Sequence, residues 1–197
     1  MVRAYHVIFC AYGFWLPNDP RGSWSDFVGA WELLRFGRAT KTCTRQSRAS
    51  APHDHARRAQ AKQALKYPPV SFTGIQARAV AHGFVEYVAK AGLSVWACSI
   101  LPEHVHMVIS RNRRLIEQIV NHLKGSATRH MIQDGLHPLA GCARPGRRPP
   151  HMWARGQWTV YLNDDAEIRR AIRYVQNNPL REGKRRQCWR FVTEFAR

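Results

Sequence analysis

The stretch Ser94-Val-Trp-Ala-Cys-Ser-Ile-Leu-Pro-Glu-His-Val-His-Met-Val-Ile-Ser110 decides which fold this chain can adopt. It holds two runs rich in apolar and β-branched residues, separated by Pro102. Such runs are typical of strands, and proline interrupts a strand. We therefore predict two strands, over residues 94–101 and 103–110, joined by a tight turn.

Elements with strand or helix periodicity flank this pair of strands on both sides. We predict a strand over 4–12, a helix over 25–36, a basic helix over 55–67, a helix from Thr73 to Gly92, a helix over 115–132, a strand over 157–162, and a helix from Asn163 or Asp164 to the break at Pro179. This order predicts an α+β fold, ferredoxin-like (RRM-like), with a central antiparallel sheet and an extra C-terminal helix. In that fold the first and third strands are central neighbours.

The 197 residues fit a single domain over 1–183, with an expected insertion at 13–73 and a basic tail at 184–197. Apolar residues make up 45% of the chain, which excludes a wholly disordered protein. Thr73-Gly-Ile-Gln76 has the pattern of a capping box, and Gly92 is a typical helix stop.

The charge is strongly positive, with 31 Lys and Arg against 13 Asp and Glu. Such a surface attracts polyanions, and nucleic acid is the default partner. A general nucleic-acid binder is the plain alternative, and a membrane-surface protein fits less well. The five cysteines are scattered and never form a CxxC pair, which disfavours a zinc ribbon or a disulfide framework. With no signal peptide or membrane-spanning run in view, we expect a cytoplasmic, nucleoid-associated protein.

His104 and His106 are the first candidate site. Alternation along a strand places both imidazoles on one face, with Val105 and Met107 on the other. Two histidines on a rigid element supply half of a metal site. An HxH pattern alone is a weak signal, worth roughly one chance in five of metal binding.

The second candidate lies downstream, in Ile172-Arg-Tyr-Val-Gln-Asn-Asn-Pro-Leu-Arg181. Tyr174 and Asn178 are four residues apart and share one face of a helix. Taken singly, Tyr174 fits a core aromatic and Asn178 fits a helix terminator before proline. Together with the histidine pair, they indicate metal-assisted phosphodiester chemistry with a tyrosine nucleophile.

In this interpretation His104 and His106 hold a divalent ion that polarises the scissile phosphate. The amide oxygen of Asn178 completes the site from the helix that carries Tyr174. Glu103 adjoins the pair but should point to the opposite strand face, so we do not count it as a ligand.

Both segments resemble a known family. Leu101-Pro-Glu-His-Val-His-Met-Val-Ile109 resembles the HUH signature (histidine, hydrophobic, histidine) of single-tyrosine transposases. Tyr174-Val-Gln-Asn-Asn-Pro-Leu-Arg-Glu-Gly183 resembles their nucleophile helix, especially that of REP-associated tyrosine transposases. Lys124-Gly-Ser-Ala-Thr-Arg129 and the segment from Trp153 to Tyr161 also resemble family segments.

The resemblance covers about residues 4–183. It implies divalent-metal dependence and strand cleavage that leaves a 5′-phosphotyrosine and a free 3′-OH. By motif position it implies Tyr174 as nucleophile, His104 and His106 as metal ligands, and Asn178 as third ligand. The insertion at 13–73 departs from the smallest members of the family.

The DNA-holding surface is a softer prediction, based on positive charge and aromatic rings. For Trp153 and Trp158, stacking on bases and core packing are equally supported. The candidate DNA contacts are Arg21, Lys124, Arg147, Arg148, Trp153, Arg155, Arg181, Lys184, Arg185 and Arg186.

The leading hypothesis is therefore an enzyme: a single-strand DNA endonuclease and strand transferase, or transposase. Its cofactor would be Mg²⁺ or Mn²⁺, and its partner single-stranded or hairpin DNA, with repetitive extragenic palindromes (REP elements) as one option. A catalytically silent nucleic-acid-binding protein of the same fold and a replication-initiator or relaxase-type nickase stay open as alternatives. A homodimer also stays open, and no membrane partner is expected.

Overall fold

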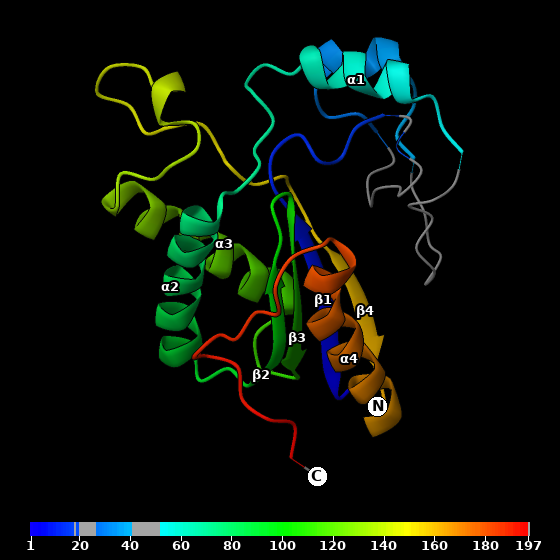
Figure 1. Cartoon of the computed structure of the whole chain (residues 1–197), viewed down its shortest axis with the longest axis vertical. Coiled ribbons are helices and arrows are strands. Elements are labelled where there is room, and N and C mark those ends of the chain that lie inside the picture. Colours follow the sequence, from blue (N-terminus) through cyan, green and yellow to red (C-terminus); the bar gives the residue numbers. More distant parts are fainter. Residues whose placement is uncertain (18, 20–26, 41–51, 197) are drawn as a thin grey trace.

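A four-stranded antiparallel sheet forms the centre of the molecule (Figure 1). The computed structural model describes residues 1–17, 19, 27–40 and 52–196. The strands are β1 (Ala4–Cys10), β2 (Val95–Ile100), β3 (His104–Ser110) and β4 (Trp158–Leu162), in the order β2-β3-β1-β4. The predicted ferredoxin-like order is confirmed, with β1 and β3 paired antiparallel at the centre.

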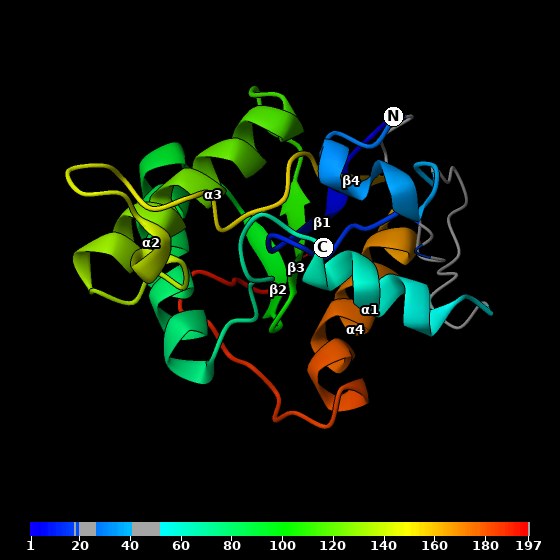
Figure 2. The same cartoon turned by 90° about the horizontal axis from the view of Figure 1, so that it is seen from above.

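The helices make two layers, one on each face of the sheet (Figure 2). α2 (Gly74–Ala91) and α3 (Ile116–Gln133) cover one face, and α4 (Asp165–Arg181) covers the other. The face under α2 and α3 is the main apolar core, to which β3 contributes Val105 and Met107, both fully buried. The strand alternation predicted for β3 is therefore confirmed.

α2 and α3 cross at very short range. A Cβ atom built on Gly83 of α2 would lie 2.5 Å from the Cα of Ala127 in α3. Only glycine allows two backbones to come this close, so Gly83 fixes the distance between the helices.

The predicted helix ends are well satisfied. Thr73 accepts a hydrogen bond from the Gln76 amide at 3.2 Å, and the Gln76 side chain accepts one from the Thr73 amide at 3.0 Å. This capping box is the one predicted. Gly92 ends α2 in the left-handed conformation, with φ of 60°. Asp164 caps α4 by accepting from the Glu167 amide at 2.8 Å.

Two helix predictions in the segment between β1 and α2 need correction. Only a short 3₁₀ helix, η1 (Trp31–Phe36), replaces the helix predicted over 25–36, of which the first two residues lie outside the described part of the chain. The basic helix α1 (His55–Gln63) stops before Tyr67, because the residue that precedes Pro68 is pushed towards extended backbone. α1 and η1 share a small apolar cluster of their own, formed by Leu16, Leu33, Phe36 and Ala61.

The helix that carries Tyr174 does not end at Pro179, as predicted, but continues to Arg181. Proline removes one amide donor and clashes with the preceding turn, and the helix ends soon after it, at Arg181. The last turn closes through other donors, with the Glu182 amide bonded to the Asn178 carbonyl at 3.3 Å. Asn178 therefore lies inside the helix and is buried.

The chain after Gly183, predicted as a basic tail, packs against the domain. The Gln187 side chain accepts from the Ile100 amide and donates to the Ile100 carbonyl, each at 2.8 Å. Phe191 is buried in the main core, and the Thr193 amide donates to the Val95 carbonyl at 2.8 Å. The segment is basic, as predicted, but it is anchored to β2 because its apolar residues have a place in the core.

Within the described residues, no helix is long and apolar enough to cross a membrane.

Candidate active site

His104 and His106 project from the face of β3 that α4 covers. They lie in register with Cys10 and Ile8 of β1, respectively. Their ring centroids are 4.9 Å apart with the planes at 73°. His106 is buried and His104 is half-buried. The central position in the sheet gives both imidazoles a stiff mount.

His6 of β1 joins this pair and was missed in the sequence. Its Nε2 lies 3.1 Å from Nδ1 of His106, so one ring nitrogen donates a hydrogen bond to the other. The two rings are stacked, with centroids 5.3 Å apart. A single histidine in a strand is weak evidence for a functional site, but two features of the sequence could have identified His6. Its strand was expected beside the histidine strand, and alternation there limits which residues share a face.

Burial keeps these imidazoles neutral. It lowers the pKa of His6 to about 4. Burial also lowers the pKa of His106 well below its ordinary value, and the charges of His104 and His6 add to this effect. A neutral imidazole has a free lone pair on one nitrogen, which is the form that binds a metal ion.

Tyr174 points into the histidine cluster from α4. Its ring centroid lies 5.7 Å from that of His6 and 5.6 Å from that of His106, edge-on in both cases. The Arg181 guanidinium lies over the same ring, 5.3 Å from its centroid. Arg181, predicted to contact DNA, is thus placed beside the candidate nucleophile.

Asn178 follows Tyr174 by one helical turn, and Glu182 follows by two. Glu182 also approaches a histidine: its Oε1 lies 3.8 Å from Nε2 of His104. Tyr174 and Glu182 both contact the histidine cluster, and Asn178 lies between them in the sequence. Glu182 was not singled out in the sequence, although it lies within the quoted segment from Tyr174 to Gly183.

The residues fit a divalent ion, provided that the third ligand is an amide. Among the described residues, no three His, Cys, Asp or Glu side chains are arranged to hold a metal. His6 is a neighbour of the candidate ligand pair, bonded to His106. With its Nδ1 bonded to His6, His106 has Nε2 left for an ion. Two imidazoles and one amide oxygen form a neutral donor set that could hold a divalent ion.

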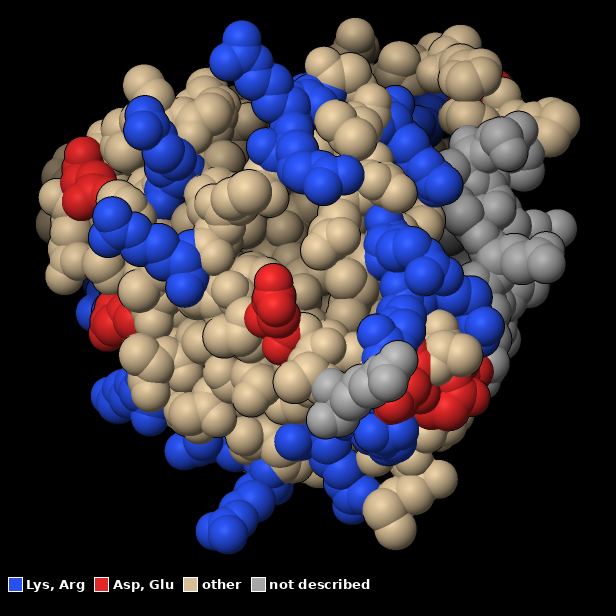
Figure 3. Space-filling view, turned by 60° about the horizontal axis from the view of Figure 1, so that its bottom comes forward, with Lys and Arg blue, Asp and Glu red and all other residues tan. Residues whose placement is uncertain are grey.

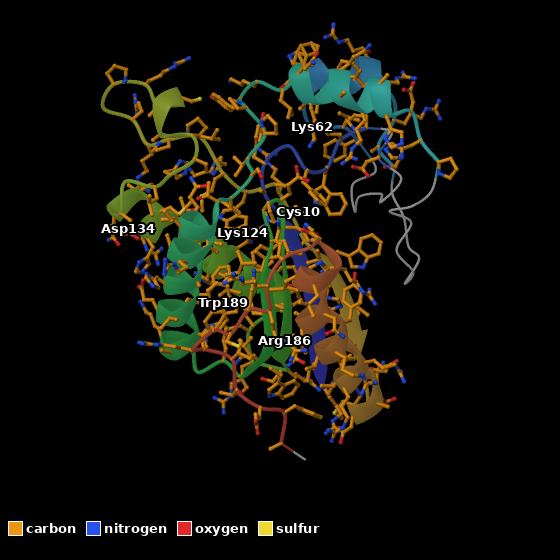
Figure 4. The ribbon with its side chains drawn as sticks, viewed as in Figure 1. Cys10, Lys62, Lys124, Asp134, Arg186 and Trp189 are labelled. Carbon is orange, nitrogen blue, oxygen red and sulfur yellow. The ribbon has the colours of Figure 1, made fainter. Side chains whose placement is uncertain are left out.

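Glu103, which was not counted as a ligand, has a partner outside the histidine cluster. It forms an ion pair with Lys62 of α1, with 3.0 Å between Nζ and Oε1. Lys62 reaches down from α1 towards the sheet (Figure 4). Phe14, at the start of the predicted insertion, packs against His104 with ring centroids 5.2 Å apart. The segment between β1 and α2 therefore borders the site.

Lys124 and Trp153, two candidate DNA contacts, are buried in this structure. The Lys124 ammonium donates to the carbonyls of Ala154 and Gly156 at 2.9 and 2.6 Å (Figure 4). The Trp153 indole donates to the Lys124 carbonyl at 3.2 Å, and its ring packs on Phe9. Both residues hold the segment before β4 in place, which favours core packing over base stacking for Trp153.

The other candidate DNA contacts among the described residues lie at the surface, and on the face drawn in Figure 3 positive side chains outnumber acidic ones. Arg21 lies outside the described residues. The exposed ones are Arg147, Arg148, Arg155, Arg181, Lys184, Arg185 and Arg186.

Comparisons with known proteins identify the family of this chain. The family described as IS200-like transposases matches residues 64–178, a range that includes the histidine pair, Tyr174 and Asn178. No curated protein matches the chain.

Among solved structures, a REP-associated tyrosine transposase bound to a REP hairpin is similar over 92% of this chain and 68% of its own, with 11% identity and a TM-score of 0.47. A protein from Deinococcus radiodurans described as a transposase is similar over 90% of this chain and 92% of its own, with 12% identity and a TM-score of 0.38. The family match spans more than half of the chain. The chain thus belongs to the family of IS200-like transposases.

Proposed function

We propose that this transposase cleaves and rejoins single-stranded or hairpin DNA through a 5′-phosphotyrosine intermediate, with a divalent metal ion. One observation carries the proposal. The Tyr174 ring lies against His6 and His106 while Asn178 and Glu182 follow on the same helical face. Tyr174 and the candidate ligand Asn178 thus share one helix that packs against the histidine strand.

In the proposed step, the Tyr174 phenol oxygen attacks the phosphorus of a phosphodiester. A bond forms between tyrosine and the 5′ phosphate, and the bond to the 3′ oxygen breaks. The phenol proton is lost, and the departing oxygen gains a proton to become a free 3′-OH. The reverse reaction, with a 3′-OH as nucleophile, restores a phosphodiester and frees Tyr174.

His104, His106 and Asn178 are the proposed ligands of the ion. When bound, the ion supplies a Lewis acid that polarises a non-bridging phosphate oxygen and orients the phosphate for attack. All three ligands are uncharged, so the ion should bind weakly until a phosphate adds negative charge. DNA and metal should therefore strengthen each other's binding.

His6 is a positioning residue in this proposal. If His106 donates its Nδ1 proton to Nε2 of His6, the tautomer of His106 is fixed with the lone pair on Nε2. The stacked arrangement also restrains the rotation of the His106 ring. His6 thus prepares the ligand without touching the ion.

All of these groups come from one chain, so a complete site does not require a second copy. A DNA partner is supported by the excess of Lys and Arg and by the relative that is bound to a REP hairpin. REP-type hairpins with single-stranded flanks are the first substrates to test.

The test is cleavage of labelled hairpin oligonucleotides with Mg²⁺, with Mn²⁺ and with excess chelator. We expect a denaturation-resistant protein–DNA adduct and a 3′-OH product only with metal, while DNA binding survives chelation and weakens with salt. Calorimetric metal titrations, with and without an uncleavable hairpin, measure the coupling. Full cleavage in excess chelator would overturn the metal assignment, and tight metal binding by the free protein that survives His104→Ala would place the ion elsewhere.

A further inference from the structure

A basic pocket lies away from the histidine cluster. It has a volume of about 310 Å³ and is lined by Lys66, Tyr67, Arg144, Arg147, Arg148 and Pro150. Two segments form it: the connection from α1 to α2, and the loop that joins α3 to β4. This loop extends from the α2 and α3 side of the molecule, whereas α4 lies on the opposite face of the sheet (Figures 1 and 2).

The pocket concentrates positive charge without compensation. Four of its lining residues are cationic, and no carboxylate lines it. No ion pair within the described part of the chain involves Lys66, Arg144, Arg147 or Arg148. Like charges held close together repel one another, and an anion seated between them relieves that repulsion. The charge distribution therefore favours a phosphate group.

The Arg-rich side of the pocket is a folded turn. The Arg147 amide donates to the Arg144 carbonyl at 2.9 Å, and Gly146 between them adopts φ of 70°. A glycine is needed at such a positive φ. Pro145 inside the turn and Pro149 shortly after it limit the freedom of the backbone.

Tyr67 gives the pocket an aromatic wall that is already in place. Its half-buried ring packs edge-on against Tyr12, with centroids 6.1 Å apart, and the Lys66 ammonium lies 5.6 Å from its centroid. An aromatic ring beside a cluster of cations is the combination that binds a single-stranded nucleotide, with the base on the ring and the phosphates on the cations.

We propose that this pocket binds one unpaired nucleotide of the DNA substrate, away from the phosphodiester that is cut. Its phosphates contact Arg144, Arg147 and Arg148, and its base packs on Tyr67. The volume is at the lower end for small-molecule pockets, which suits one nucleotide rather than a duplex. The inference depends on the proposed function for its DNA substrate, but not on the chemistry at Tyr174.

The experiment measures the affinity of the full chain for hairpins with single-stranded flanks, in which one flank nucleotide at a time is made abasic. Wild-type protein should lose about tenfold in affinity at one flank position. Tyr67→Ala should lose about as much with the intact oligonucleotide and should no longer respond to the abasic change there. Tyr67→Phe, which keeps the ring, should behave as wild type.

The charge is tested with Arg147→Ser/Arg148→Ser, and the matched control is Arg78→Ser/Lys90→Ser on the exposed side of α2. Both pairs remove two charges from the surface. The first pair should weaken binding at least tenfold and lower the salt dependence by about two phosphate contacts, whereas the control should change affinity by about threefold or less.

The proposed nucleotide pocket would be overturned if both pairs of charge substitutions lowered DNA affinity equally. It would also be overturned if Tyr67→Ala left the response to abasic positions unchanged. Loss of adduct formation with an intact abasic profile would instead overturn the proposed chemistry and leave the pocket standing.

Discussion

The two faces of the sheet differ: one holds the main apolar core, and the other carries the candidate active site. The face under α2 and α3 is packed with apolar side chains such as Phe9, Val105 and Met107. The face under α4 has a smaller apolar cluster and buries polar side chains beside it, among them His6 and His106. Residues only one position apart in β3 belong to different faces, and so to different tasks.

Because of this difference, we expect that stability and catalytic activity can be changed separately in this protein. The apolar face holds the strands rigid, and the polar face uses that rigidity to fix ligand positions. Substitutions on one face should therefore leave the property carried by the other face nearly intact. Four predictions test that separation, in order of decreasing expected effect.

Tyr174→Phe should abolish the covalent DNA adduct. The substitution removes one hydroxyl with almost no change in volume, so the free energy of unfolding should change by less than about 0.5 kcal/mol. The measurement is adduct formation on denaturing gels beside chemical denaturation. Tyr161→Phe, at an exposed position of β4, is the control and should keep full activity. An adduct that persists in the Tyr174→Phe variant would remove Tyr174 from the mechanism.

Gly83→Ala should destabilise the protein by about 3 kcal/mol, because the added Cβ collides with the backbone of Ala127 and pushes α2 from α3. Adduct formation per folded molecule should stay unchanged. Gly125→Ala in α3 has room for its Cβ and should be neutral or slightly stabilising. Urea denaturation of both variants decides, and equal stability of the two would contradict the close crossing.

Lys124→Met should flatten the alkaline part of the stability profile. Burial lowers the pKa of Lys124 to about 8 in the folded protein, against 10.5 in the unfolded chain. Between these values the unfolded state holds more protons, so wild-type stability rises with pH there. The rise relative to the Met variant should be about 2 kcal/mol between pH 8 and 10.5, and parallel profiles would contradict it.

His6→Ala should weaken metal binding in the presence of an uncleavable hairpin by roughly tenfold, the lower end of such effects. His6→Gln keeps an acceptor for the His106 proton and should restore most of the affinity. Nitrogen NMR of the His106 ring should show a mixture of tautomers in the Ala variant and one tautomer in the Gln variant. Unchanged tautomers in both would remove the positioning role of His6.

Much of the fold was predictable because its signals are local. The capping box at Thr73, the stop at Gly92 and the alternation around His104 each involve only a few neighbouring residues. The continuation of α4 past Pro179 was not predictable in this way. Whether a helix survives a proline depends on partners for the last carbonyls, and the sequence does not display these.

The parts that could not be predicted depend on contacts between distant residues. His6 and His106 are 100 positions apart, and Gln187 and Ile100 are 87 apart. Pairing of this kind follows from strand register and from the path of the last segment, not from composition. Lys124 shows the same limit, since its charge indicated a DNA contact while its partners are the backbone carbonyls of Ala154 and Gly156.

The amide of Gln187 imitates a strand residue, since it gives and takes one hydrogen bond at Ile100. A little further along, Val192 forms a parallel bridge with Val95 at the opposite end of β2. The outer border of the sheet is thus closed at both ends of this strand by the chain's own last turns. Exposed sheet borders recruit strands from other molecules and lead to aggregation. Truncation before Gln187 would therefore lower the solubility of the protein first.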